Sequence, residues 1–241
     1  MSSIEAHYHH PSDMKNLATL RRHTPESFRA FGAFDAAALH AESNTIPRKY
    51  LELMATAVGL TTQCVYCIEG HVRAATQEGA STAEVAETVM ITAALRAGGG
   101  LVHGRHALAL ATAPAEGAGD QAEDHKARGM AALRRGAPSA FNGFVQFNKA
   151  ALHGENNTIS RKYTELIAVA VALTTQCMDC IAAHTAAAQT EGATTAELAE
   201  TIFVATALRA GAGVAHGMMA LKFHLDEASA QAENEKERTS A

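Results

Sequence analysis

The chain has 241 residues, a formal net charge of −5 and 47% hydrophobic residues. The mild negative charge provides no basic field for nucleic acid or an anionic lipid surface, and the polar N-terminus lacks the apolar core of a secretory signal. The longest unbroken apolar run, residues 166–173, is much shorter than the roughly 20 residues that span a bilayer. We therefore expect a cytoplasmic protein that binds neither nucleic acid nor a membrane.

The chain contains one 28-residue stretch twice. Residues 44–71 read NTIPRKYLELMATAVGLTTQCVYCIEGH and residues 157–184 read NTISRKYTELIAVAVALTTQCMDCIAAH, with matching positions displaced by 113 and no gap. This repeat is too long for a solenoid unit, so it indicates two covalently joined copies of one unit. Good helix formers dominate and Pro is scarce, which predicts an all-α fold for both copies.

The first half of each copy is expected to contain four helices. Residues 1–13 are polar and His-rich, which is typical of a loose terminal arm. A short helix is predicted from Met14, and a second one from Pro25, whose Phe residues at helical spacing indicate a core face rather than a cofactor site. The next helix begins after residues 44–45, and a break near residues 61–62 separates it from the cysteine helix, which stops at Gly79.

The second half of each copy is expected to contain two more helices. Capping-box patterns at residues 81–84 and 194–197 open one helix, which is predicted to end at Gly98 or Gly211. A glycine-rich turn then leads to a last helix. The predicted units are residues 14–112 and 127–225, with about six helices each, a linker over 113–126 and a charged tail over 226–241 that is solvated helix or disorder.

All four cysteines lie in a repeated pattern, E-x11-C-x2-C-x3-H. On a helix that turns about 100° per residue, the two cysteines and the histidine share a stripe about 60° wide. In the first turn of a helix, unpaired N–H groups and the macrodipole favour a thiolate. In a reducing cytosol such a pair is expected to be redox-active or metal-bound. The candidate catalytic residues are Glu52, Cys64, Cys67 and His71 in the first copy and Glu165, Cys177, Cys180 and His184 in the second.

The glutamate of this pattern lies on a helix face of mostly small residues, among them Ala55 and Gly59. Another helix can approach such a face closely, so we expect a partly buried carboxyl group that holds or passes a proton near neutral pH. An exposed helix glutamate is the alternative. With the histidine, a buried acid would form a proton relay to a cysteine pair that attacks an O–O or S–S bond and closes to a disulfide, which an external dithiol must reduce.

These residues resemble the alkylhydroperoxidase D-like branch of the carboxymuconolactone decarboxylase family, whose members show helix, Glu, C-x-x-C and His in this order. The similarity covers residues 14–110 and 127–223. It implies an all-α fold assembled as trimers or hexamers, reduction of a small hydroperoxide by the thiol pair, and no tightly bound cofactor. It also implies a lipoyl-type protein or a peroxiredoxin partner as the thiol reductant. The C-terminal cysteine attacks in that family, which corresponds to Cys67 and Cys180.

The resemblance has further consequences for assembly and for individual residues. A trimer of tandem chains would form a homo-oligomer that mimics a family hexamer. Some family members place a histidine immediately before the attacking cysteine, where this chain has Tyr66 and Asp179. A tyrosine can still donate a proton, but an aspartate disfavours a nearby thiolate, so the second site is expected to be slower or differently tuned.

Four other histidines recur between the copies. His103 and His216 follow the glycine-rich turns and are candidates for a second layer around the site or a substrate pocket. A histidine on an apolar helix is more often a satisfied core residue, which is the alternative here. His40 and His153, which precede the glutamate helix, are weaker candidates.

Alternatives to a peroxidase stay open at this point. The protein is then a disulfide reductase that serves a peroxiredoxin, or a carboxymuconolactone decarboxylase-like protein without peroxidase activity. A third alternative is a helical assembly in which two cysteines, a histidine and a glutamate bind zinc. Metal analysis and thiol titration in the presence of peroxide separate these alternatives from redox catalysis.

Overall fold

The computed structural model describes residues 11–112 and 122–240. Within these residues the protein is all-α, as predicted, with one 3-10 helix, ten α-helices and no strand. In the first copy the elements are η1 (Pro11–Met14), α1 (Lys15–His23), α2 (Pro25–His40), α3 (Arg48–Thr62), α4 (Val65–Gln77) and α5 (Thr82–Ala111). In the second copy they are α6 (Ala122–Gly136), α7 (Pro138–His153), α8 (Arg161–Thr175), α9 (Met178–Thr190) and α10 (Thr195–Ser240).

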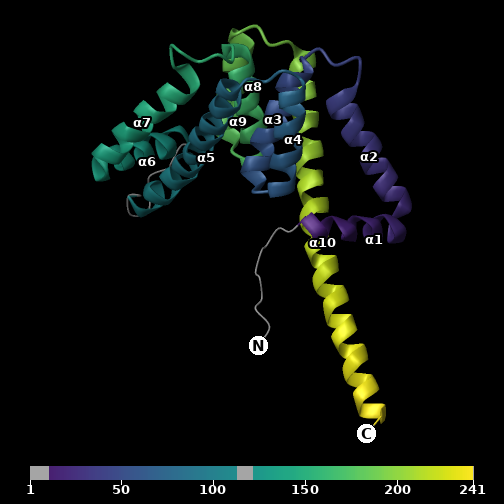
Figure 1. Ribbon diagram of the computed structural model, residues 1–241. Helices are drawn as coiled ribbons and strands as arrows, with labels where there is room; N and C mark the ends of the chain where they lie inside the picture. The colour runs from purple at the N-terminus through teal and green to yellow at the C-terminus, as the bar shows by residue number, and fades with distance from the viewer. Residues whose placement is uncertain (1–10, 113–121, 241) are drawn as a thin grey trace.

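The core lies where the two copies meet, between α3 and α8 (Figure 1). All residues of 51–59 in α3 and of 164–172 in α8 are buried, so these helices are covered on every side. At the start of the two helices the rings of Tyr50 and Tyr163 stack with their centroids 3.8 Å apart. The glutamate helices of both copies are therefore the centre of one shared core.

The last helix of each copy packs on the other copy. α5 contacts α6, α7 and α8, whereas α10 contacts α1, α2, α3 and α4. Figure 1 shows α10 running alongside the first copy, and α5 lying beside α6 and α7. The two copies are thus intertwined, because each one is covered by a helix that the other supplies. The predicted units are repeats in sequence, but they are not separate globules in space.

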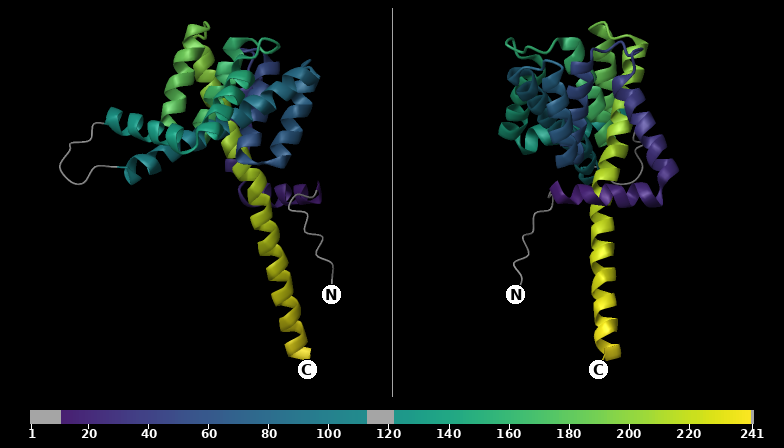
Figure 2. Two further views of the ribbon diagram at one scale, coloured as in Figure 1. Left: turned by 90° about the vertical axis from the view of Figure 1, so that its left-hand side faces the viewer. Right: turned by 45° about the vertical axis from the view of Figure 1, so that its right-hand side comes forward.

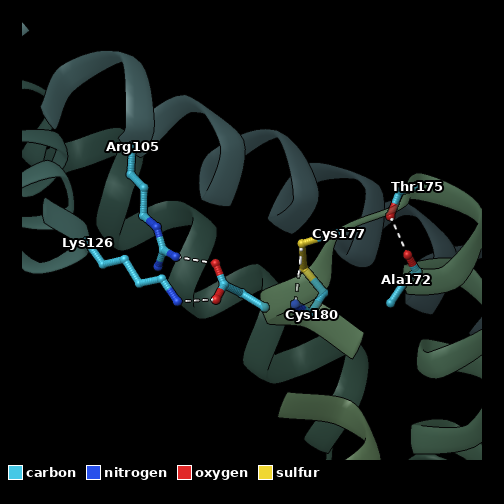
Figure 3. The surroundings of a disulfide bond; sticks show 7 residues. Arg105, Lys126, Ala172, Thr175, Cys177 and Cys180 are labelled. Carbon is cyan, nitrogen blue, oxygen red and sulfur yellow. Dashed lines mark hydrogen bonds and ion pairs between the residues drawn. A yellow bond between two sulfur atoms is a disulfide. The ribbon is translucent and has the colours of Figure 1, made fainter. Parts of the chain in front are cut away.

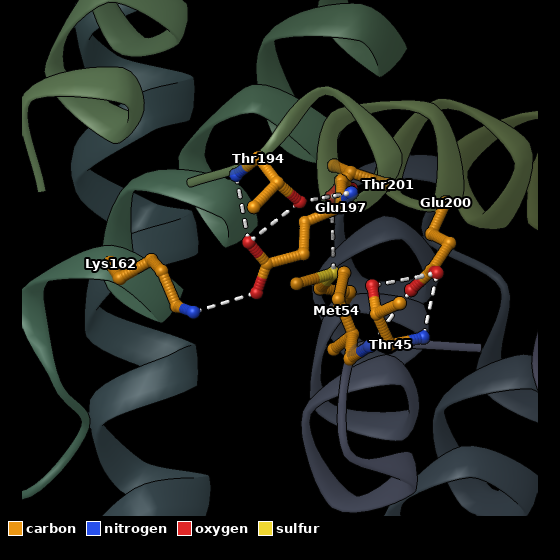
Figure 4. A network of polar contacts seen from close by, with 8 residues as sticks. Thr45, Met54, Lys162, Thr194, Glu197, Glu200 and Thr201 are labelled. Carbon is orange, nitrogen blue, oxygen red and sulfur yellow. Dashed lines mark hydrogen bonds and ion pairs between the residues drawn. The ribbon is translucent and has the colours of Figure 1, made fainter. Parts of the chain in front are cut away.

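Two glutamates fix this exchange from matching positions. Glu200 of α10 accepts hydrogen bonds from the backbone N–H groups of Thr45, at 2.7 Å, and Ile46, at 2.8 Å (Figure 4). The hydroxyl group of Thr45 donates a third bond at 2.9 Å. Glu87 of α5 makes the same three bonds to residues 158–159. These carboxylates satisfy backbone donors of the loop before each glutamate helix.

We expect Glu200→Ala to lower the free energy of unfolding by about 1–2 kcal/mol, because two backbone N–H groups lose a charged acceptor. Urea denaturation followed by circular dichroism measures the change. Glu69→Ala is the control, since Glu69 is 59% exposed and pairs with Arg73 on the same helix. Its expected effect is at most about 0.5 kcal/mol. Equal effects of the two substitutions would contradict a role for Glu200 in joining the copies.

The prediction that Gly98 and Gly211 end their helices is wrong. α5 and α10 continue through the glycine-rich segments, so each copy has five α-helices instead of about six. A Cβ atom on Gly98 would lie 3.6 Å from the ring of Phe144, and one on Gly211 would lie 3.7 Å from the ring of Phe31. Both distances are ordinary van der Waals contacts, so the rings do not require glycine at these positions. Without a proline, nothing interrupts the helical hydrogen bonds.

The boundaries of the arm and the linker also differ from the prediction. Residues 11–13, expected in a loose arm, lie in η1, where Asp13 is only 1% exposed. Residues 122–126, expected in the linker, form the start of α6. Residues 1–10 and 113–121 lie outside the described residues. The tail over 226–240 is an exposed continuation of α10 that projects from the body of the protein (Figure 2), so the solvated helix is the correct alternative.

Two helices are long and apolar enough to cross a membrane by length and composition alone. They are α5 and residues 195–239 of α10, whose most apolar windows are 33% and 39% buried in this structure. The central helix of a soluble bundle meets the same criterion, and both helices here pack against the shared core. The absence of membrane binding stays a prediction.

Candidate functional site

A tight turn between α3 and α4 places the first cysteine pair. Gln63 has a left-handed backbone, with φ of 58°, and Cys64 after it is extended and caps α4. The backbone N–H of Cys67 donates to Sγ of Cys64 at 3.3 Å. Cys177 and Cys180 repeat this arrangement at 3.4 Å. The first cysteine is therefore the N-cap residue rather than part of the first turn, and its sulfur replaces the oxygen that usually caps a helix.

Both cysteine pairs are joined by disulfide bonds, with Cα atoms 5.2 Å apart. Cys64 and Cys177, the first cysteine of each pair, have 0% exposure. Cys67 is half-buried and Cys180 is 8% exposed. In each copy the second cysteine of the pair is thus more exposed than the first, and this difference in exposure is larger in the first copy.

A buried glutamate contacts a histidine in each copy. Glu52 is 1% exposed, and its Oε2 lies 2.8 Å from Nδ1 of His71. Glu165 is 2% exposed and lies at the same distance from His184. The alternative of an exposed helix glutamate is therefore wrong. Each histidine follows the second cysteine by four residues, so the two side chains share one face of their helix.

The structure adds an arginine to this cluster that the sequence analysis did not identify. Nε of Arg48 lies 3.8 Å from Oε1 of Glu52 and 3.3 Å from Glu78. Nδ1 of His40, a weaker candidate from the sequence, lies 4.0 Å from the same Oε1. That oxygen accepts no hydrogen bond from a described residue. The i,i+4 spacing of Arg48 and Glu52, which the second copy repeats, was the available sequence signal.

Asp35 of α2 distinguishes the first site from the second. Burial raises the pKa of this carboxyl group, His71 and His40 oppose the rise, and the charge of Glu52 adds to it. The matching residue of the second copy is Asn148, which cannot titrate. A comparison of the two copies at this position would have indicated that their surroundings differ.

The side chain between the cysteines has a different partner in each copy. The hydroxyl group of Tyr66 donates to Oδ2 of Asp13 at 3.1 Å, and Nζ of Lys222 lies 3.3 Å from Oδ1 of the same carboxylate. Tyr66 and Asp13 come from α4 and η1, whereas Lys222 comes from α10. An acid, a phenol and an ammonium group therefore meet beside the first disulfide.

The second copy replaces this arrangement by two ion pairs. Arg105 of α5 and Lys126 of α6 both donate to the carboxylate of Asp179, and Nζ of Lys126 lies at 2.7 Å (Figure 3). The hydrogen bond from Lys126 lowers the pKa of Asp179; burial opposes this, and the charges of Arg105 and His103 lower it further. The negative charge is thus compensated by two cations, so the electrostatic reason to expect a slower second site is weaker than its sequence indicates.

His103 and His216 are exposed on α5 and α10, so neither is a buried core residue. His103 lines a pocket of about 720 Å³ that also reaches Cys177, and its substrate-pocket role stays a prediction. The other lining residues are Val102, Arg105, His106, His125, Lys126, Gln176, Met178 and Asp179.

The predicted zinc ligands do not form a metal site in this geometry. In residues 11–112 and 122–240, no group of three or more His, Cys, Asp or Glu side chains is arranged to hold a metal ion. The four cysteine sulfurs are bonded in pairs instead. The zinc alternative stays a prediction that metal analysis tests.

The fold and the sites define a class of protein: an intertwined all-α tandem in which each copy carries a disulfide at a helix N-terminus and a buried Glu–His pair. The model of the carboxymuconolactone decarboxylase family matches residues 25–113 and 138–223. The chain therefore belongs to the carboxymuconolactone decarboxylase family, with one family unit in each copy. This confirms the tandem duplication.

A solved structure from Burkholderia xenovorans LB400, described as a gamma-carboxymuconolactone decarboxylase subunit, is similar to this chain. The TM-score is 0.66 at 18% identity, over 88% of this chain and 91% of the other, which shows a shared fold and nothing more. Uncharacterized protein 4 in the cox locus of Paracoccus denitrificans is 40% identical over 65 residues, 27% of this chain and 59% of that protein. The chain thus spans less than two thirds of that relative. An uncharacterized protein of Cupriavidus necator is 32% identical over 96 residues, 40% of this chain and 83% of that protein.

Proposed function

We propose that the protein is a thiol-dependent hydroperoxide reductase with one site in each copy. The observation that carries this proposal is the repeated arrangement of a cysteine pair at a helix N-terminus, one turn before a histidine that contacts a buried glutamate. Such a pair alternates between dithiol and disulfide, and the Glu–His pair supplies or accepts the protons that this change requires.

The proposed reaction has two steps in each copy. The thiolate of Cys67 or Cys180 attacks the terminal oxygen of a hydroperoxide, the O–O bond breaks, and the products are a sulfenic acid and, after protonation, an alcohol. The thiol of Cys64 or Cys177 then attacks the sulfenic sulfur, which forms the disulfide and releases water. The accessibility of Cys67 relative to Cys64 supports its role as the attacking residue.

The histidine is the group best placed to move the proton to the leaving oxygen. His71 is half-buried and shares a helix face with Cys67, and its Nδ1 contacts Glu52. The carboxylate fixes the orientation of the ring. Arg48, 3.8 Å from Glu52, limits the cost of a negative charge in this buried position.

The reductant, the location and the assembly belong to the same proposal. A dithiol-bearing protein, of lipoyl type or a peroxiredoxin partner, returns each disulfide to the dithiol. A reducing cytoplasm supplies such thiols. Exposed apolar side chains at matching positions, Val89 with Ile202 and Met90 with Phe203, support a homo-oligomer, for which we propose a trimer of tandem chains.

Peroxide consumption by the fully reduced protein tests the function. After removal of the reductant, we expect the protein to consume hydroperoxide, up to one equivalent for each cysteine pair, as the two disulfides form. Mass spectrometry of alkylated peptides assigns the oxidation to residues 64–67 or 177–180. Thiols that stay reduced in excess peroxide would overturn the proposal. Pairs that cycle only with protein disulfides would favour a disulfide reductase instead.

A further inference from the structure

The pocket of about 720 Å³ reaches the second disulfide from the side of its first cysteine. Cys177 is among the lining residues and Cys180 is not. Cys180 precedes His184 by one turn, so the pocket approaches the disulfide from a direction other than that of the Glu–His pair. The pocket therefore ends at the buried first cysteine, and a molecule in it lies beside the second disulfide.

The lining of this pocket includes two cations, Arg105 and Lys126, and one carboxylate, that of Asp179. Arg105, whose side chain is 15% exposed, and Lys126, at 46%, share a single carboxylate, that of Asp179. A guanidinium group has five N–H donors and an ammonium group three, so both cations keep donors for a second anion. Figure 3 shows the two side chains converging from different helices beside the disulfide.

Three imidazole groups extend the same wall. Nδ1 of His106 lies 2.7 Å from Nε2 of His125, so one ring donates to the other. His103 lies near enough to Asp179 to lower the pKa of that carboxyl group.

The matching positions of the first copy carry no such charges. Met218, which is 1% exposed, replaces Arg105, and Asp13 replaces Lys126. Met218 forms an apolar cluster with Cys64, Ala212 and Ala215 that packs against the first disulfide. At these two positions the second copy has two cations, whereas the first copy has an apolar side chain and a carboxylate that pairs with Lys222.

We propose that this pocket binds the thiol reductant of the second site and selects thiols that bear a carboxylate, with Arg105 and Lys126 as the recognising cations. The proposal rests on the function proposed above, because it requires a disulfide that is reduced in each cycle. A thiolate attacks one sulfur of the disulfide between Cys177 and Cys180, the bond between the cysteines breaks, and the other cysteine leaves as a thiolate that takes a proton from the solvent. A second thiol attacks the mixed disulfide, so two thiols yield one organic disulfide and both cysteine thiols.

The reduction of the two disulfides of one molecule tests this selectivity. The oxidised full-length protein is treated at low ionic strength with 3-mercaptopropionate, which is anionic, or with 2-mercaptoethanol, which is neutral. Alkylation and mass spectrometry give a rate constant for each disulfide. For each disulfide, the rate constant with 3-mercaptopropionate is divided by the rate constant with 2-mercaptoethanol. The ratio at residues 177–180 is then divided by the ratio at residues 64–67, and this quotient cancels the intrinsic reactivity of the two thiols.

We expect this quotient to be about five to ten at low salt and to fall toward one in about 0.5 M salt, because the attraction is electrostatic. Arg105→Gln with Lys126→Gln should bring it to about one at low salt. Arg21→Gln with Arg22→Gln, on α1, makes the same change in net charge and should leave the quotient unchanged.

The failure of this proposal differs from that of the proposed function. A quotient of one in the unmodified protein, with both disulfides reduced by both thiols, would overturn the selectivity and leave the peroxidase proposal intact. Disulfides that no thiol reduces would overturn the proposed function and the selectivity together. Circular dichroism of the Arg105 and Lys126 double variant verifies its fold, and its rate with the neutral thiol reports the integrity of the second site.

Discussion

Replacement of both Cys67 and Cys180 by Ser is expected to lower peroxide consumption at least a hundredfold, because a serine hydroxyl group is not ionised at neutral pH and does not attack the O–O bond. The single variants report each copy separately. If both sites work, Cys67→Ser and Cys180→Ser each leave the activity of the other copy, and the disulfide of the unchanged pair still forms. Initial rates of peroxide loss, with the peptides assigned by mass spectrometry, measure these outcomes.

The first cysteine of each pair provides the matched control. Cys64→Ser with Cys177→Ser keeps the attacking thiols, so the first equivalent of peroxide should still react. The sulfenic acids then have no partner in the chain, and we expect sulfinic and sulfonic acids at residues 67 and 180 in excess peroxide. Loss of the first equivalent in this variant, with retention in Cys67→Ser with Cys180→Ser, would show that the assignment of the two roles is reversed.

Replacement of the buried glutamates is expected to have the second largest effect. Glu52→Gln with Glu165→Gln keeps the size of the side chains but removes the charges that contact His71 and His184 at 2.8 Å. A histidine without its carboxylate passes a proton less effectively, so we expect a loss of about 10²–10⁴ in the rate of peroxide reduction. Stopped-flow measurement with the reduced protein gives this rate directly.

Glu84→Gln controls for the burial of a carboxylate. Glu84 is 6% exposed, pairs with Lys49 at 2.7 Å, and closes the capping box of α5. Its substitution should reduce stability without a comparable loss of peroxide reduction. Glu84 takes part in a helix cap and an ion pair, and it contacts no histidine of the proposed relay. Rates that fall equally in Glu84→Gln and in the Glu52 and Glu165 double variant would point to general destabilisation.

The sequence was sufficient for the local structure of the site. The repeated spacing of the acid, the cysteines and the histidine identified the residues that the structure brings together, and the small residues around Glu52 correctly indicated burial. Helix periodicity cannot show which copy covers which site, because that depends on packing between segments far apart in the chain. Arg105 and Lys126 were therefore missed, as they reach Asp179 from helices outside its own hairpin.

Local rules also failed where tertiary contacts decide the outcome. Many helices end at a glycine, but Gly98 and Gly211 lie inside α5 and α10, which continue along the other copy. The expected aromatic core was only partly correct for a related reason. The Phe residues of α2 are half-buried at the edge of the protein, while Leu39 is buried in the shared core.

α5 and α10 each pack on the other copy, so the covalent fusion of the two copies affects how their sequences can diverge. In a dimer of identical subunits, every substitution appears at both sites, so a change that suits one site is imposed on the other. Covalent linkage removes this constraint, because the helix over each site has its own sequence. Arg105 covers one disulfide and Met218 the other, so one chain holds two unlike disulfide sites in a fixed ratio, and no separate subunits have to recognise the correct mate.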